Sequence, residues 1–283
     1  MTETVLITGC SSGIGRETAL FFLADGWEVY ATARNPADVQ TLGEKGANVA
    51  KLDVTEDDDV ERVVSRVVDE HGHVDCLVNN AGYAQPGPVE DVPIERVHDQ
   101  FDVNVYGPLR LTRAVLPHMR ERGLGTVVNV SSAIGRVAVP GMGIYGGSKS
   151  ALEGITDSLR GEIAEYGVDA VLVEPGPVDT ELYERATDEI DGVERSGAYE
   201  RFYEMYEDRR AIDGGMPGAV SPATVADTIL DAANVQDPDP RYPVGTSAKV
   251  AEYGRFVPAK WRDRLYETFS DLSTSDWARK LLG

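Results

Sequence analysis

The most constraining feature of the sequence is a glycine-rich segment close to the N-terminus, Thr8-Gly9-Cys10-Ser11-Ser12-Gly13-Ile14-Gly15. It follows the apolar run 4–8 and leads into residues 13–25, where apolar residues recur at helical spacing. Glycines let the backbone turn tightly and approach a pyrophosphate. The helix start adds free N–H groups and the positive end of its dipole. We therefore predict a strand–loop–helix unit that binds a nucleotide.

Strand-like and helix-like segments alternate along most of the chain. Apolar runs predict strands at 4–8, 28–32, 47–52, 74–78, 125–130, 168–173 and 241–245. Helical spacing predicts helices at 13–25, 36–44, 56–71, 94–122, 145–166, 221–233 and 250–283. In the long helix, Pro108 and Pro117 are expected to act as local breaks. The alternation predicts an α/β fold of three layers, in which helices cover both faces of a doubly wound parallel sheet.

The pattern contains no linker that would divide the chain. We therefore expect a single domain, 1–283. Within it we expect a helical substrate lid at about 181–220, where aromatic and charged residues are mixed. A C-terminal extension is expected at about 246–283.

The chain is strongly acidic, with 27 basic and 48 acidic residues and a net charge of −21. This charge repels nucleic-acid phosphates and anionic membrane surfaces, so we expect neither as a partner. No apolar run approaches the ~18 residues of a membrane span, and the N-terminus does not resemble a signal peptide. Cys10 and Cys76 do not form a disulfide framework, and they fit a reducing cytoplasm.

Two explanations of the acidity stay open. The chain is either an ordinary acidic protein or one adapted to high salt. Surplus carboxylates keep a protein soluble when salt screens charges to a Debye length of ~3 Å at 1 M. The composition resembles that of proteins from halophilic archaea, and we expect a halophilic source.

A second motif, Tyr145-Gly-Gly-Ser-Lys149, falls in a predicted helix. Residues four apart share one helix face, so the Lys149 ammonium favours the phenolate of Tyr145. It thereby lowers the tyrosine pKa from ~10 towards operating pH. Ser132 ends the fifth predicted strand, and ligands of doubly wound sheets bind outside such carboxyl ends. These residues predict proton transfer next to a nucleotide site.

Taken in order, the motifs resemble those of the short-chain dehydrogenase/reductase family. The resemblance runs across about residues 3–245 and implies a Rossmann sheet of about seven strands. It gives Tyr145 the role of general acid and base, and Ser132 that of the donor that holds the substrate oxygen. By the same resemblance, Lys149 binds the nicotinamide ribose and tunes Tyr145, and Asn104 holds a water that links Lys149 to solvent.

The resemblance also implies the residues that bind the cofactor. Asp53 is expected at the adenine edge, Asn80 near the adenosine ribose, and Val178 and Thr180 at the nicotinamide carboxamide. The full expected set is Gly9, Ser11, Ser12, Gly13, Ile14, Gly15, Arg34, Asp53, Asn80, Ala81, Gly82, Tyr145, Lys149, Pro175, Gly176, Val178 and Thr180.

The end of the second predicted strand favours NADP(H) over NAD(H), although NAD(H) stays possible. An NAD site of this fold places an acid there, which bonds the ribose 2′-hydroxyl. Here Ala33 stands in that place and Arg34 follows, and a guanidinium can bind phosphate oxygens in a fork. Many NADP-selective relatives carry a second basic residue just before the middle glycine, where this chain has Ser12. We therefore expect a moderate preference.

The expected reaction is hydride transfer between nicotinamide and a carbonyl or secondary alcohol. The loop sequences and the tail resemble the hydroxysteroid and retinol dehydrogenase branch, so we expect a lipophilic substrate. Aromatic residues within 181–206 either form a lipophilic lid or only pack that segment. Two alternatives stay open: a sugar-nucleotide epimerase or dehydratase of the extended type, and a cofactor-sensing regulator without catalysis.

No metal is expected. The four histidines, His71, His73, His98 and His118, form no ligand pattern, and we place them on the surface. The family commonly forms dimers or tetramers through the helices at about 94–122 and 145–166. We therefore expect a homodimer or homotetramer.

Overall fold

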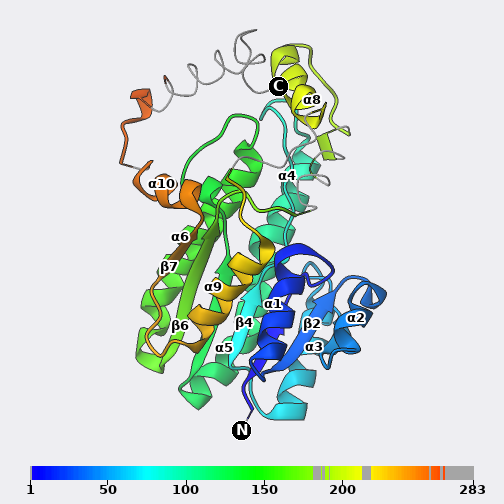
Figure 1. Ribbon diagram of the computed structural model, residues 1–283, viewed down its shortest axis with the longest axis vertical. Helices are drawn as coiled ribbons and strands as arrows, with labels where there is room; N and C mark the ends of the chain where they lie inside the picture. Colours follow the sequence, from blue (N-terminus) through cyan, green and yellow to red (C-terminus); the bar gives the residue numbers. More distant parts are fainter. Residues whose placement is uncertain are drawn as a thin grey trace.

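The computed structural model confirms the predicted fold, with one parallel sheet of seven strands (Figure 1). The order across the sheet is β3-β2-β1-β4-β5-β6-β7, and all neighbouring strands are parallel. The strands are β1 Thr4–Ile7, β2 Glu28–Ala33, β3 Asn48–Lys51, β4 Cys76–Asn79, β5 Gly125–Val130, β6 Val168–Pro175 and β7 Arg241–Val244. The strand order reverses between β1 and β4, where ligands of such sheets bind outside the carboxyl ends.

The structure describes residues 2–180, 186, 189–190, 192–211, 218–254, 256–261 and 264. The expected helix at 250–283 therefore lies mostly outside the described residues. Its described beginning belongs to α10, Thr246–Gly254. Much of the expected lid is described, including α8, Glu200–Ala211.

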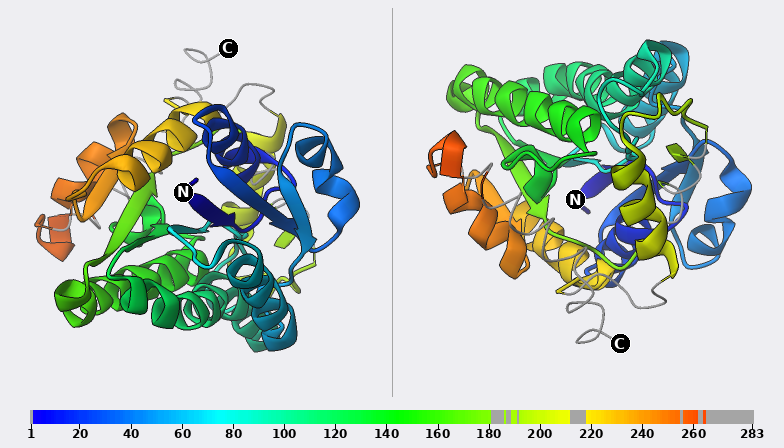
Figure 2. Two further views of the ribbon diagram at one scale, coloured as in Figure 1. Left: turned by 90° about the horizontal axis from the view of Figure 1, so that it is seen from below. Right: turned by 90° about the horizontal axis from the view of Figure 1, so that it is seen from above.

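Helices cover both faces of the sheet (Figure 2). One face carries α1, Gly13–Ala24, and α9, Pro222–Asn234. The other face carries α3, Asp57–His71, α5, Gly107–Arg122, and α6, Gly143–Ile163. Two separate apolar cores result, because successive strand residues point to opposite faces.

The alternation is visible in β1 and repeats in its neighbours. Val5 and Ile7 pack in the core with Phe22 of α1, whereas Leu6 packs in the core with Val63 of α3. The connection after β2 is a 3₁₀ turn followed by the short helix α2, Gln40–Gly43, which buries Leu42.

The predicted helix at 94–122 is interrupted, but the sequence reading placed one of its breaks wrongly. It consists of α4, Ile94–Phe101, a π-helical turn at Asp102–Tyr106, and α5. Pro108 lies in the first turn of α5, where its missing N–H costs nothing. Pro117 lies inside α5 and does not end it.

The histidine prediction is also wrong in one case. His73 is buried, and its Nε2 lies 3.1 Å from Asp75 Oδ2. Asp75 also accepts a hydrogen bond from Thr4 N at 2.7 Å and pairs with Arg122. His73 Nε2 is buried without a hydrogen bond among the described residues, so its contact with Asp75 is an ion pair only if the imidazole is protonated.

The described part of segment 181–220 packs beside the carboxyl end of the sheet (Figure 1), and its role as a lid stays a prediction. Tyr203 of α8 is buried and donates a hydrogen bond to Asp91 Oδ2 at 2.8 Å. Before α8, Glu189 pairs with Arg96 of α4, and Ala186 packs with Ala84 and Tyr145. The described part of this segment is therefore joined to the rest of the protein by polar and apolar contacts.

Candidate active site

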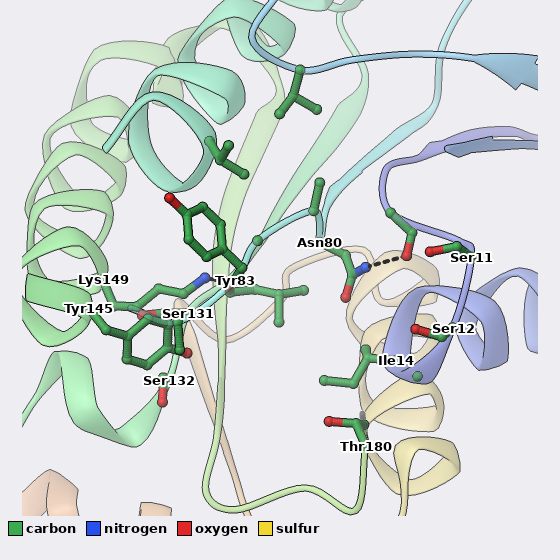
Figure 3. A pocket seen from close by; sticks show the side chains of 18 of the residues that line it. Ser11, Ser12, Ile14, Asn80, Tyr83, Ser131, Ser132, Tyr145, Lys149 and Thr180 are labelled. Carbon is green, nitrogen blue, oxygen red and sulfur yellow. Dashed lines mark hydrogen bonds between the residues drawn. The ribbon is translucent and has the colours of Figure 1, made fainter. Parts of the chain in front are cut away.

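A cavity of about 870 Å³ opens at the carboxyl ends of β1, β4, β5 and β6. It reaches from the glycine-rich loop to Tyr145 and Lys149, and Figure 3 shows these two groups on opposite sides of it. All of the predicted site residues line this cavity except Gly15 and Asn104. Residues from seven separate parts of the sequence are thus brought to one place.

The glycine-rich loop is built so tightly that side chains do not fit at two of its glycines. Gly9 has a φ of +72°, and an added Cβ would lie 2.9 Å from Ala81 Cα. At Gly15 an added Cβ would lie 2.3 Å from the Gly9 oxygen. Gly15 therefore stands behind the cavity wall, where it lets α1 begin directly against the loop.

The N-terminal end of α1 faces the cavity, and the positive end of its helix dipole favours the binding of an anion there. Ser12 is the N-cap residue, and the first turn contains no acidic side chain. Ser11, Ser12 and Ile14 project on the same side of the cavity as Thr180 (Figure 3). Unshielded N–H groups and the helix dipole at such a position suit a pyrophosphate.

Asn80 braces this loop from the neighbouring strand end. Its Nδ2 donates hydrogen bonds to the Thr8 oxygen at 2.9 Å and the Gly9 oxygen at 3.1 Å. The Thr8 hydroxyl in turn accepts from the backbone N–H groups of Asn80 and Ala81, each at 3.0 Å. These bonds hold the ends of β1 and β4 together at the point where the strand order reverses.

Tyr145 and Lys149 lie on the same face of α6, as their spacing predicts. Both are buried, and Lys149 Nζ lies 5.9 Å from the centre of the Tyr145 ring. Nζ donates a hydrogen bond to the Val130 oxygen at 2.8 Å, which joins α6 to the end of β5. Burial lowers the pKa of Lys149 to about 8, although Glu153 acts in the opposite direction.

Ser132 follows the end of β5 and lies beside Tyr145 in the cavity (Figure 3). It is the N-cap of the 3₁₀ turn Ala133–Gly135, and its hydroxyl accepts a hydrogen bond from Ile134 N at 3.3 Å. The hydroxyl proton is thus not used by that bond, and a serine hydroxyl can donate as well as accept.

Asn104 lies behind these residues, in the π-helical turn. Its Nδ2 donates to the Tyr83 oxygen at 3.0 Å and to Ser148 Oγ at 3.1 Å, while its Oδ1 accepts from Tyr83 N at 3.2 Å. Asn104 therefore ties the loop after β4 to α6. The predicted water link to Lys149 stays a prediction.

The far end of the cavity lies at the end of β2, where Ala33 is the last strand residue and Arg34 follows it. Arg34 is exposed, with no hydrogen bond or ion pair to other described residues. Asp53 also lines this end, and its Oδ1 accepts bonds from Thr55 N at 3.0 Å and Thr55 Oγ1 at 2.7 Å. No acidic residue occupies the place of Ala33 at the end of β2.

A model of the short-chain dehydrogenase family matches residues 3–191. The chain belongs to this family. The uncharacterized oxidoreductase YusZ of Bacillus subtilis is 35% identical over 260 residues, which cover 88% of this chain and 91% of YusZ. Human retinol dehydrogenase 8 is 41% identical over 190 residues, 64% of this chain and 60% of that enzyme.

Solved structures give the same result. A short-chain dehydrogenase from Streptomyces avermitilis superposes with a TM-score of 0.80 at 33% identity and covers 97% of this chain and 99% of its own. A short-chain dehydrogenase from Burkholderia cenocepacia, solved in complex with NADP, has a TM-score of 0.75 at 25% identity, over 94% and 97% of the two chains. This chain is thus an oxidoreductase of the short-chain dehydrogenase type.

Sequence reasoning missed several residues of this dehydrogenase site. Tyr83 follows the predicted Gly82 directly, and its ring projects into the cavity (Figure 3). Burial, with Asp99 and Glu189 nearby, raises the pKa of Tyr83 to about 12. The only sequence feature that could have pointed to Tyr83 is its position next to Gly82, a predicted cofactor-binding residue. Ile134, Met142, Arg96, Asp99 and Glu189 also line the cavity and carry no motif.

The aromatic residues of the lid do not form the lining that one of the two readings allowed. Among the described residues, Tyr199, Phe202, Tyr203 and Tyr206 are absent from the cavity wall. They contact the loop before α4 and one another instead. For these four residues, the prediction that they pack the segment is the one that fits, and Tyr183 lies outside the described residues.

Neither a cluster typical of a metal site nor a helix able to span a membrane occurs among the described residues. In that part of the chain, no cluster of His, Cys, Asp and Glu side chains has the arrangement of a metal site. None of its helices is long and apolar enough to cross a membrane. Cys10 and Cys76 are both buried free thiols.

Proposed function

We propose that this protein is an NADP(H)-dependent oxidoreductase that interconverts a carbonyl compound and a secondary alcohol. The observation that carries the proposal is one continuous cavity, with Tyr145, Lys149 and Ser132 at one end and the glycine-rich loop with Arg34 at the other. Tyr145 and Lys149 are intact and buried together. This argues against a cofactor-sensing regulator that has lost its acid and base.

The residues present fit a dinucleotide. No side chain fits at Gly9 or Gly15, so the loop packs closely against Ala81 and against its own backbone, as a tight pyrophosphate-binding turn requires. The first turn of α1 adds no negative charge. When bound, the nicotinamide supplies or accepts the hydride. The loop, Thr180 and Val178 would hold the dinucleotide, with its nicotinamide at the end of the cavity where Tyr145 lies.

The proton transfer belongs to the chain's own residues. During reduction, the Tyr145 hydroxyl donates its proton to the substrate oxygen, and Ser132 donates a hydrogen bond to that oxygen. The Lys149 ammonium favours the tyrosinate that remains, and it would also donate a hydrogen bond to the nicotinamide ribose of a bound cofactor. Asn104 keeps the loop after β4 and α6 in register, and it carries the water through which Lys149 exchanges protons with solvent.

The choice of NADP(H) rests on the end of β2. Arg34 stands at the cavity with no partner among the described residues, and no carboxylate repels a 2′-phosphate at Ala33. The bound cofactor of the Burkholderia relative, NADP, supports the same choice. Many NADP-selective relatives have a second basic residue where this chain has Ser12, which offers a hydroxyl but no charge. We therefore expect a moderate preference for NADP(H) over NAD(H).

The substrate proposal is a ketone or secondary alcohol with apolar atoms next to the reacting carbon. Around Tyr145 the cavity is lined by Ala84, Ile134 and Met142, which form one apolar cluster with the Tyr145 ring. The similarity to a retinol dehydrogenase supports a lipophilic substrate. An epimerase or dehydratase of the extended type finds no specific support in this cavity.

The experiment is a screen of ketones and secondary alcohols with NADPH, NADH and their oxidised forms, in molar KCl, followed by nicotinamide absorbance. We expect turnover of apolar ketones, with kcat/KM higher for NADPH. Cofactor binding without turnover of any carbonyl or alcohol would instead favour the regulator. Turnover with NADH at an equal or better kcat/KM would refute the cofactor assignment.

A further inference from the structure

Four charged side chains form a buried ion cluster behind the proposed catalytic residues. Its members are Arg136, which follows the 3₁₀ turn after Ser132, Glu153 of α6, Glu174 of β6 and Arg241 of β7. Arg136 lies 3.2 Å from Glu153 and 3.1 Å from Glu174, and Arg241 lies 3.0 Å from Glu153 and also pairs with Glu174. Buried charges are costly unless every one is paired, so their geometry is closely specified.

Within this cluster, Glu153 holds both ends of the short segment that carries Ser132. Its Oε1 accepts a hydrogen bond from Ser131 Oγ at 2.9 Å, and its Oε2 lies 3.2 Å from Arg136 Nε. Ser132 stands between these two anchors. The carboxylate also fills the space beside Gly135, where an added Cβ would lie 2.4 Å from Oε1.

Glu153 also lies one helical turn beyond Lys149, on the same face of α6. Lys149 bonds the Val130 oxygen, and Glu153 bonds Ser131, the next residue. Ser131 N in turn donates to the Val173 oxygen of β6 at 2.8 Å. Two successive turns of α6 are therefore bonded to two successive residues at the end of β5.

These contacts decide how Ser132 faces Tyr145, because one residue follows β5 and the other lies on α6. We infer that Glu153 is a positioning residue for the reaction, which acts through Ser131 and Arg136 to hold Ser132 against Tyr145. The inference rests on the proposed function for its catalytic consequence. Glu153 itself touches neither substrate nor cofactor, since it does not line the cavity.

Two variants separate the contact from the charge. Ser131→Ala removes the bond to Glu153 and leaves all four charges of the ion cluster in place. Glu153→Gln keeps the size but turns an amide N–H₂ towards donors, either the guanidiniums or the Ser131 hydroxyl. The same helix offers a matched control pair: Ser158 Oγ donates to Glu162 Oε1 at 3.0 Å, and this bond is exposed. Ser158→Ala and Glu162→Gln make the same chemical changes away from the site.

The first readout needs no activity: hydrogen exchange of the backbone across residues 131–136, followed by mass spectrometry. We expect exchange at least roughly fivefold faster in Ser131→Ala and in Glu153→Gln, and wild-type exchange in both controls. Unchanged exchange in the two cluster variants would overturn the inference, whatever the activity. Glu153→Gln is the variant more liable to unfold. If it unfolds, the exchange rates of Ser131→Ala alone test the inference.

The second readout is the rate of carbonyl reduction, divided by the concentration of protein that binds NADPH. Ser131→Ala should lower kcat roughly 10-fold and change the KM for NADPH by less than about twofold, because misplacement of a reacting group affects the chemical step. Faster exchange with wild-type kcat would overturn the positioning role. If the wild-type protein reduces no carbonyl, the proposed function is refuted. The hydrogen-exchange measurement would still test whether Glu153 holds segment 131–136 in place.

A pH profile completes the test. Lys149 is faced by Tyr145 and Glu153 from α6, and beyond Glu153 lie Arg136, Glu174 and Arg241. Loss of the Glu153 charge disfavours the ammonium. The alkaline fall of kcat for reduction should therefore move to lower pH by roughly half a unit or more in Glu153→Gln. In Ser131→Ala, where the Glu153 charge remains, the alkaline fall of kcat should stay at the wild-type pH. If both variants lose kcat equally at every pH, with no shift of the alkaline fall in Glu153→Gln, Glu153 has a structural role only.

Discussion

Lys149 combines two demands that oppose one another at the residue scale. Its ammonium must lie beside the Tyr145 ring, yet burial disfavours its charged form and lowers its pKa to about 8. The bond to the Val130 oxygen and the charge of Glu153 offset part of that cost. Such a perturbed lysine is typical of a functional site, where stability is given up for chemistry.

This burial predicts a pH dependence of stability. Between the folded pKa of about 8 and the unfolded pKa of ~10.4, the unfolded chain holds a proton that the folded chain has lost. The free energy of unfolding should therefore rise with pH across this window, by at most about 3 kcal/mol from this group. Urea unfolding of wild type and Lys149→Met at pH 7.5 and 10 measures it, and the variant should lose its relative advantage at the higher pH.

The neighbouring phenol is the main confounder of that measurement. Repeating the comparison in a Tyr145→Phe background removes it. A stability difference between the lysine and methionine proteins that is the same at both pH values would contradict a depressed lysine pKa.

The chemistry-bearing residues were readable from sequence because their spacing is local. Tyr145 and Lys149 share one helix face, and the three glycines share one loop. Glu153 and Ser131 carried no such signal. Their partners Arg136, Glu174 and Arg241 lie far apart in the sequence, so the fold alone brings the buried ion cluster together.

At the scale of elements, our proposal assigns the choice between the two cofactors to the end of β2. Arg34→Ala should raise the KM for NADPH at least roughly 10-fold, because it removes the guanidinium that we propose binds the 2′-phosphate, and should change the KM for NADH less than about twofold. Steady-state kinetics with both cofactors measure the ratio. Arg113→Ala, an exposed change on α5, serves as control. Equal effects of Arg34→Ala on both cofactors would place Arg34 outside phosphate recognition.

The junction of the glycine-rich loop with α1 gives a steric prediction. Gly15→Ala puts a Cβ 2.3 Å from the Gly9 oxygen, so the loop must move and the pyrophosphate site is distorted. The Kd for NADPH, measured by fluorescence titration, should rise at least roughly 10-fold. Gly161→Ala on α6 meets nothing within 4 Å and should instead stabilise the fold by about 0.5–1 kcal/mol. Wild-type affinity in Gly15→Ala would show that the loop tolerates the side chain.

Most elements followed from apolar spacing, and the exceptions have physical reasons. β5 begins and ends where its apolar run does, at Gly125 and Val130. The π-helical turn of Asn104 was not predictable, because it depends on bonds between Asn104 and Tyr83 across the fold. Pro117 was read as a break, although a helix can continue past a proline when its packing is sufficient.

The whole molecule is dominated by its net charge of −21. Self-repulsion of this size destabilises a compact state, and dissolved ions screen it. Adaptation to high salt therefore stays a prediction of the composition. If it holds, the melting temperature and the activity should both be lower at low ionic strength than in molar KCl. A melting curve indifferent to salt between these limits would instead indicate an ordinary acidic protein.

The account depends most directly on Tyr145 as the acid. Tyr145→Phe removes the transferable proton and little packing, so it should bind NADPH with a Kd within about twofold of wild type. Its kcat for reduction of a ketone found in the screen should fall by at least roughly 100-fold. The decisive measurement is this pair of values, NADPH affinity and kcat, on wild type and Tyr145→Phe in molar KCl. Retained affinity with lost turnover is the predicted result, and near-normal turnover in Tyr145→Phe would contradict the account.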